Sequence, residues 1–149
     1  MKLQVATSDE SELVASFVAA LLTELTGGEL VDPADLEPTT SHLLERDNVI
    51  GILAYDLGEP VGLIMLNECA AIYAGGFFGE ITELYVLPEM RSKGVAARLV
   101  EEAYATGKTR GWKRLEVGAP DQPAWNRTMD FYQGNGFAEV GPRLRKLIA

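Results

Sequence analysis

The stretch from Leu84 to Leu99, LYVLPEMRSKGVAARL, constrains the fold of this chain more than any other part of its sequence. A strand-like apolar run meets Pro88, and an amphipathic, helix-like pattern begins a few residues later. Arg91, Lys93 and Gly94 lie between the two patterns. The chain therefore leaves a strand and enters a helix through a short, basic turn, which favours a sheet covered by helices.

Short apolar patterns separated by glycine and proline predict the other elements. The chain of 149 residues, 47% hydrophobic, is expected to form a single globular domain over residues 1–149. The order of elements predicts a mixed α/β fold, in which one sheet carries packed helices. In the first part of the chain we expect a strand at 3–5, a helix over Leu13–Leu25, a loop over 28–40 and a short helix at Ser41–Arg46; the first helix opens with a Thr7/Glu10 capping box and ends at Gly27-Gly28. A hairpin of Val49–Asp56 and Val61–Asn67 across Gly58-Glu59-Pro60 follows, and then a strand at Glu80–Leu87. The remaining expected elements are a helix over Lys93–Thr109, a strand at Leu115–Val117, a helix over Trp125–Gly134, and closing strands at Phe137–Val140 and Leu144–Ile148.

Charge is distributed unevenly along the chain. The net charge is −9, and residues 1–90 hold 16 acidic and 2 basic residues, whereas residues 91–149 hold 6 acidic and 11 basic ones. An acidic protein without a basic stripe is not expected to bind nucleic acid. The asymmetry fits a cationic partner on one side and an anion on the other, and a merely solvated surface is the alternative.

Residue usage excludes several other classes. Cys69 is the only cysteine and His42 the only histidine, so neither an internal disulfide nor a Cys/His metal site is expected, and we predict no metal. The apolar run Leu13–Leu22 is shorter than the roughly 20 residues of a membrane span and follows acidic residues, unlike a signal peptide. We therefore expect a cytoplasmic protein without membrane partners.

The basic turn has the properties of an anion site. A helix N-terminus exposes unpaired N–H groups, and the small residues Gly94 and Ala96 let those amides converge on a phosphate. Arg91, Lys93 and Arg98 add positive charge at the same helix start. Neither a P-loop nor a GxGxxG fingerprint is present. The turn predicts a pyrophosphate site, and an ordinary strand-to-helix turn is the alternative.

Two motifs carry a family resemblance. LYVLP before RxxGxA, followed by Leu99, resembles motif A of the GNAT acetyltransferases, and FYxxxGF about 35 residues later resembles their motif B. The order of elements agrees over nearly the whole chain. The resemblance implies a mostly antiparallel, twisted sheet flanked by helices, acetyl-CoA as the acetyl donor, and an amine as the usual acceptor.

The resemblance also assigns the side of the protein that binds the cofactor. Backbone groups of Leu84, Tyr85 and Val86 would pair with the pantetheine arm like an added strand. The family often has an asparagine seven residues before the motif B tyrosine, but Trp125 stands there and Asn126 follows. The expected cofactor-binding residues are Leu84, Tyr85, Val86, Arg91, Ser92, Lys93, Gly94, Val95, Ala96, Ala97 and Asn126.

Three residues are catalytic candidates. Tyr132 stands at the family's general-acid position, with a packed core aromatic as the alternative. Glu80 corresponds to the base of the histone-acetylating branch, and Glu83 to an acid common in members that act on small molecules. Strand alternation predicts opposite faces for the two glutamates. Glu83 is favoured as the base because it lies nearer the Tyr85–Val86 backbone.

The acceptor is expected to be cationic. Residues 23–48 hold seven acidic residues and one basic residue, and an acidic entrance favours a small cationic amine or a protein amine, unless these residues form only a solvated loop. A catalytically silent coenzyme-A-binding module that regulates a partner is the alternative function. A second alternative function is that of a nucleotide-binding protein that uses the same basic turn to bind phosphate. A homodimer is conceivable through the edge of a closing strand such as Leu144–Ile148.

Overall fold

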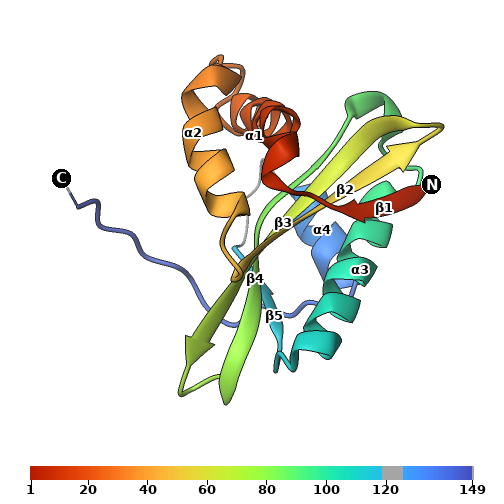
Figure 1. The fold of residues 1–149 in the computed structure, drawn as a ribbon. Helices are drawn as coiled ribbons and strands as arrows, with labels where there is room; N and C mark the ends of the chain where they lie inside the picture. Colours follow the sequence, from red (N-terminus) through yellow and green to blue (C-terminus); the bar gives the residue numbers. More distant parts are fainter. Residues whose placement is uncertain (119–125, 149) are drawn as a thin grey trace.

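The computed structural model describes residues 1–118 and 126–148, and its centre is a five-stranded sheet (Figure 1). The strands are ordered as in the sequence: β1 (Lys2–Val5), β2 (Val49–Asp56), β3 (Glu59–Ala71), β4 (Gly76–Val86) and β5 (Leu115–Val117). The pairs β1–β2, β2–β3 and β3–β4 are antiparallel, and β5 is parallel to β4. The expected mixed, mostly antiparallel sheet is thereby confirmed.

Helices cover both faces of this sheet (Figure 1). On one face lie α1 (Ser11–Leu25) and α2 (Pro33–Leu44), and on the other α3 (Val95–Arg110) and α4 (Asn126–Gly134). Short 3-10 turns at Ser8–Glu10 and Pro88–Met90 precede α1 and α3. The molecule thus has three layers, with the sheet between two layers of helices.

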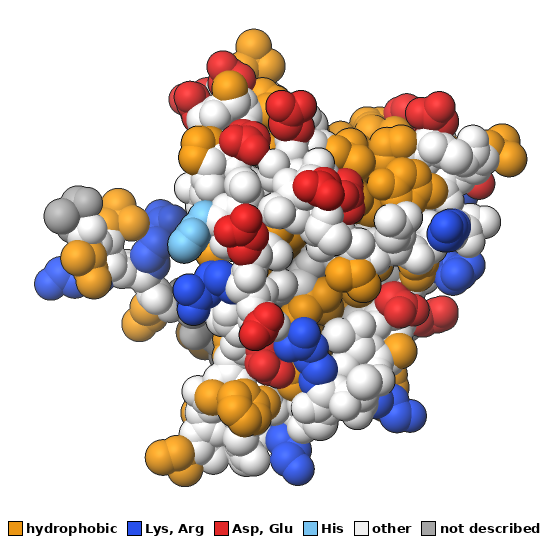
Figure 2. All heavy atoms as spheres, in the orientation of Figure 1, with side chains coloured by type: hydrophobic (Ala, Val, Ile, Leu, Met, Phe, Trp, Pro, Cys, Tyr) orange, Lys and Arg blue, Asp and Glu red, His pale blue; other side chains and the backbone are white. Residues whose placement is uncertain are grey.

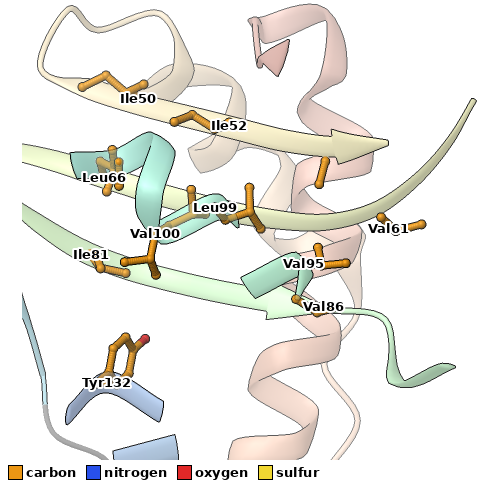
Figure 3. Packing of buried hydrophobic residues seen from close by; sticks show 13 residues of the cluster. Ile50, Ile52, Val61, Leu66, Ile81, Val86, Val95, Leu99, Val100 and Tyr132 are labelled. Atoms are coloured by element: carbon orange, nitrogen blue, oxygen red, sulfur yellow. The ribbon is translucent and has the colours of Figure 1, made fainter. Parts of the chain in front are cut away.

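Two apolar clusters fill the spaces between the layers. Alternate strand residues such as Ile64, Leu66 and Ile81 pack with Leu99 of α3 and with Tyr132 (Figure 3). The residues between them, including Leu63 and Tyr85, pack under Phe17 of α1. A strand that is buried on both faces shows little polar alternation, which explains the continuous apolar run LIML in β3.

The two turns at the ends of β3 use glycine where the backbone requires positive φ. Leu57 (φ 51°) and Gly58 (φ 82°) form a two-residue hairpin turn, so β3 begins at Glu59 rather than at Val61. At the other end of β3, Gly75 (φ 79°) and Gly76 (φ 128°) turn the chain into β4. Both β3 and the beginning of β4 extend beyond the predicted strands.

The predicted capping box is present at the start of the first helical segment. The Thr7 N–H donates to Glu10 Oε1 (3.0 Å), and the Asp9 N–H donates to Thr7 Oγ1 (3.2 Å). These bonds cap the 3-10 turn that leads into α1, and α1 ends just before Gly27 at φ 78°.

The predicted loop over 28–40 is wrong, because α2 begins at Pro33. Asp32 caps the helix, with its Oδ1 accepting from the Ala34 N–H (3.0 Å), and Pro33 occupies the first helical position, where a missing N–H costs nothing. Pro38 lies inside the helix and does forfeit a bond there. Packing on α1 compensates, and Ser11 Oγ also donates to Glu37 Oε1 (2.6 Å).

The predicted closing strands are also wrong in the described residues, since 137–148 contain neither strand nor helix. Their large apolar side chains stay exposed, as at Leu144 (92%) and Ile148 (94%). β5 pairs with β4 over only three residues, so it offers a further strand only a short edge for hydrogen bonding. A homodimer through Leu144–Ile148 therefore has no strand edge to support it.

Trp125, the expected start of the last helix, lies outside the described residues, and α4 is described from Asn126.

Candidate functional site

A β-bulge in β4 determines where the two candidate glutamates point. Glu83 lies opposite Met65, whereas Ile81 lies opposite the next residue of β3, so Thr82 is an extra residue without a counterpart. The bulge resets the alternation of side chains. Glu80 and Glu83 consequently lie on the same face of the sheet, the face that carries α1. The prediction that they face opposite sides is wrong for this reason.

The same strand loses one of its neighbours just beyond the bulge. β5 pairs with β4 only at Gly79–Ile81, whereas β3 continues to pair with β4 as far as Val86. In the described part of the chain no strand pairs with the other edge of Leu84–Val86. This segment therefore has no strand partner along the edge where β4 and β5 separate, and the Val86 carbonyl accepts a side-chain bond from Arg91 Nε (2.9 Å).

The basic turn lies at the end of that segment. Ser92 (φ 64°) and Gly94 (φ 86°) both have left-handed backbones, and Gly94 is the N-cap of α3. The first-turn amides of Val95, Ala96 and Ala97 have no acceptor within the helix. A Cβ built at Gly94 would meet nothing within 4 Å, so the space beside the N-cap is open. Such a set of backbone donors fits a phosphate group.

Arg91 is engaged by the protein itself. Its Nε donates to the Val86 carbonyl (2.9 Å), and its Nη2 pairs with Glu24 Oε2 of α1 (2.7 Å). The guanidinium also lies 5.4 Å from the centre of the Tyr85 ring. Arg91 thus ties the turn to β4 and α1, a role that the sequence did not suggest. Glu24 was recognisable in the sequence only as one of several acidic residues near the end of the first helix.

One groove connects these features. It runs along the free edge of β4 from the turn to α4, and residues of α1 and of the C-terminal segment also line it. Lys93 and Asn126 do not line it. The predicted site residues in its wall are Glu80, Glu83, Leu84, Tyr85, Val86, Arg91, Ser92, Gly94, Val95, Ala96, Ala97 and Tyr132.

Glu83 has the environment of a base. Burial raises the pKa of its carboxyl group, the nearby Glu80 carboxylate raises it further, and a hydrogen bond from Thr82 opposes both effects. Thr82 Oγ1 donates that bond to Glu83 Oε1 at 2.6 Å. A carboxylate with a raised pKa holds a proton more tightly and is a stronger general base.

Tyr132 has the environment of an acid that keeps its proton. Its side chain is 7% exposed and lies between Phe131 and Phe137, with ring centres 5.4 Å away on each side. Its hydroxyl end points toward β4 (Figure 3). Burial raises the pKa of Tyr132 to about 12, so the hydroxyl is protonated at neutral pH.

The remaining candidate, Glu80, pairs with Arg143 of the C-terminal segment, whose guanidinium donates to Glu80 Oε2. Sequence reasoning missed Arg143, which lies in the short connection between the two closing strands expected at Phe137–Val140 and Leu144–Ile148. No cluster of three His, Cys, Asp or Glu side chains in the described residues has the arrangement of a metal site. None of the helices described is both long and apolar enough to cross a bilayer.

Comparison with known proteins identifies the family. The sequence model of the Acetyltransferase (GNAT) family matches residues 16–137. The chain belongs to the GNAT family. A curated GNAT relative, the aminoalkylphosphonate N-acetyltransferase of Salmonella typhimurium, is 32% identical over 116 residues, which cover 78% of this chain and 72% of that protein.

Two further similarities agree with this GNAT assignment. An uncharacterized N-acetyltransferase of Archaeoglobus fulgidus is 39% identical over 79 residues, which span 51% of this chain and only 54% of the archaeal protein. A crystal structure described as a transcriptional regulator from Bacillus halodurans C-125 superposes with a TM-score of 0.83 over 99% of both chains at 18% identity. The likeness to that structure concerns the fold.

Proposed function

We propose that this protein transfers the acetyl group of acetyl-CoA directly to the amine of an acceptor. The observation that carries the proposal is the single groove in which the free β4 edge, the amides of the α3 N-terminus, Glu83 and Tyr132 all meet. A direct transfer requires that donor and acceptor be held in line, and residues from both sides of β4 reach this groove.

The groove has suitable groups for an extended anionic cofactor. The amides of Val95, Ala96 and Ala97 would bind the pyrophosphate, and the free backbone edge at Leu84–Val86 would pair with the amide groups of the pantetheine arm. Arg91 would support the turn through its bond to the Val86 carbonyl rather than as a free phosphate ligand. Bound acetyl-CoA would supply the acetyl group as an activated thioester.

Two side chains would move protons. An ordinary alkylammonium has a pKa near 10, so the acceptor must lose a proton before it can attack. Glu83, whose pKa is raised by burial, would take that proton directly or through water. Tyr132, protonated at neutral pH, would donate a proton to the leaving thiolate from the α4 side. The amides along the β4 edge are the available donors for the developing oxyanion.

The acceptor is proposed to be a cationic amine. Acidic side chains gather over α1 and α2 (Figure 2). Glu24, Glu80 and Glu83 line the groove, where Glu24 pairs with Arg91 and Glu80 with Arg143. The aminoalkylphosphonate named for the Salmonella relative carries an anionic group beside its amine, which these carboxylates would disfavour. A small cationic amine, or the amine of a protein, suits this surface better.

An acceptor screen tests the proposal. The purified protein is incubated with acetyl-CoA and a panel of amines that includes diamines, aminoglycosides, peptides with a free N-terminus and 2-aminoethylphosphonate, and free thiol release is measured. Amine-dependent release that is strongest with cationic acceptors supports the proposal. Tight acetyl-CoA binding without release from any amine would instead identify the catalytically silent coenzyme-A-binding module.

A further inference from the structure

The C-terminal segment after α4 places one of its own cations in the proposed acceptor groove. Residues Ala138–Arg143 line the groove, and Arg143 pairs with Glu80 on the α1 face of β4. The Glu80 side chain is 21% exposed, so this carboxylate is largely enclosed, whereas the Arg143 side chain is 62% exposed. A guanidinium that approaches from the solvent side therefore occupies the accessible side of Glu80.

The strand residues next to Glu80 carry no positive charge of their own, and Arg114 pairs with the neighbouring Glu116 (3.6 Å). The neighbour of Glu80 across the sheet on β5 is Glu116, its neighbour on β3 is Asn67, and Glu83 lies on the same face. Among the ion pairs of the described residues, Arg143 is the one cation on Glu80. The remaining ion pairs use Arg91, Arg110 and Arg114 on other carboxylates. Apart from Arg143, the described residues therefore place no ion-pairing cation on Glu80.

The segment that carries Arg143 is weakly attached. It has no strand or helix between residues 137 and 148, and Val140 (82%), Leu144 (92%) and Leu147 (77%) are exposed rather than packed. In Figure 1 it leaves the body of the molecule after crossing beside β5. Its ion pair with Glu80 is the one salt bridge that the described structure records between the segment and the rest of the protein. Another cation can therefore compete with Arg143 without breaking a packed core.

We propose that Glu80 binds a second positive charge of the acceptor, and that Arg143 covers this subsite until the acceptor arrives. The proposal rests on the acetyltransferase function proposed above and specifies its acceptor as an amine with a further cationic group. It assigns different tasks to the two glutamates that the bulge brings to one face: Glu83 deprotonates the reacting amine, and Glu80 holds the distal charge.

The spacing of the two glutamates defines the length of such an acceptor. Glu80 lies opposite Asn67 and Glu83 opposite Met65, two residues apart on β3, so their Cα atoms are about 7 Å apart. A diamine whose nitrogens are separated by about four carbons spans that distance. We therefore use 1,4-diaminobutane as the probe and butylamine as its matched monoamine.

The test compares kcat/KM for the two amines in the parent protein and in four variants. We expect Glu80→Gln to lower the diamine-to-monoamine ratio about tenfold, and Arg143→Gln to raise it about 3–10-fold by a lower KM for the diamine. In the double variant Arg143→Gln should have no further effect, because there is no longer a carboxylate to uncover. Lys146→Gln is the control, since Lys146 has the same charge in the same segment but does not line the groove.

Each contrary result has a distinct meaning. If Glu80→Gln slows both amines equally and changes the pH–rate profile, Glu80 is the base and the subsite does not exist. If Arg143→Gln leaves the ratio unchanged, Arg143 does not cover the subsite. If the parent protein acetylates neither amine nor any other acceptor of the screen, the proposed function fails, and this inference fails with it. If the parent acetylates amines but shows no ratio change in any variant, the inference alone is overturned.

Discussion

At the scale of single residues, burial shifts the pKa of both proposed proton-transfer groups in the same direction. Desolvation disfavours the charged form of each group, so it raises the pKa of both Glu83 and Tyr132. For the carboxylate this produces a stronger base, whereas the phenol, which is protonated at neutral pH with or without the shift, becomes a weaker acid. The proposed acid role of Tyr132 therefore depends on its position in the groove, and the proposed base role of Glu83 also on its raised pKa.

The Tyr132 hydroxyl can be removed without changing the ring packing. Tyr132→Phe keeps the contacts with Phe131 and Phe137, so the protein should fold and bind acetyl-CoA as before. Loss of a general acid should lower kcat roughly 10–1000-fold. Steady-state kinetics, together with calorimetric titration of acetyl-CoA, measure the two effects separately. Full activity in this variant would reduce Tyr132 to a core residue.

The pH–rate profile identifies the base. Glu83 acts only when deprotonated, so kcat/KM should rise with pH through the raised pKa of Glu83, above the ordinary value of 4.5. Glu83→Gln should remove that rise and lower the rate roughly 100-fold at neutral pH, with recovery at high pH as hydroxide deprotonates the amine.

Glu80→Gln is the matched comparison for this profile. It lies on the same strand and the same face, so it should retain the shape of the parent profile and show a smaller defect with a monoamine. Profiles of both variants that coincide with the parent would place the base elsewhere, or mean that the amine arrives already neutral.

At the scale of elements, the sequence predicted those parts of the fold that follow from local patterns. The strands from Val49 and Leu115, the capping box at Thr7 and the helix after Gly94 all depend on neighbours within a few positions. The β4 bulge at Thr82 does not, because it is defined by a register with Met65 on another strand. For the same reason the sequence found both glutamates but placed them on opposite faces.

Tertiary contacts explain the other differences. The two prolines predicted a loop, but α2 forms because α1 provides a surface on which it packs. Alternating apolar residues near the C-terminus predicted strands, but a strand also needs a partner, and β5 pairs over only three residues. Arg143 was missed because its role depends on where this segment crosses the groove.

The turn at the start of α3 can be tested against the turn at its end. Gly94 (φ 86°) and Gly111 (φ 77°) both have left-handed backbones, and a Cβ built at either position meets nothing within 4 Å. Gly94→Val and Gly111→Val should therefore lower the free energy of unfolding by similar amounts, on the order of 1–2 kcal/mol, because of backbone strain. Acetyl-CoA should raise the melting temperature of Gly111→Val as it does that of the parent, but not that of Gly94→Val. An undiminished shift in folded Gly94→Val would contradict the pyrophosphate assignment.

At the scale of the whole molecule, the two halves of the chain carry opposite charge, and the groove lies where they meet. The acidic first 90 residues supply α1, α2 and the two glutamates of β4, and the basic remainder supplies the turn, α3 and the C-terminal segment. An anionic cofactor and a cationic acceptor would thus each approach a surface of opposite sign. Their long-range attraction to the protein should be sensitive to salt, because the Debye length falls from about 10 Å at 0.1 M to about 3 Å at 1 M.

Ionic strength therefore separates the contributions of the two halves. Between about 0.05 and 1 M salt, we expect the KM for acetyl-CoA and the KM for a diamine each to rise about 3–10-fold, since both ligands lose electrostatic attraction. An aromatic amine that is neutral at the assay pH serves as the control, and its KM should change little, because no charge is screened. If salt raises the KM for acetyl-CoA but leaves that of the diamine unchanged, the acidic residues over α1 and α2 are a solvated surface without a role in acceptor binding. In that event the recognition of the acceptor would depend on shape and hydrogen bonding in the groove, and the charge asymmetry of the chain would serve the cofactor alone.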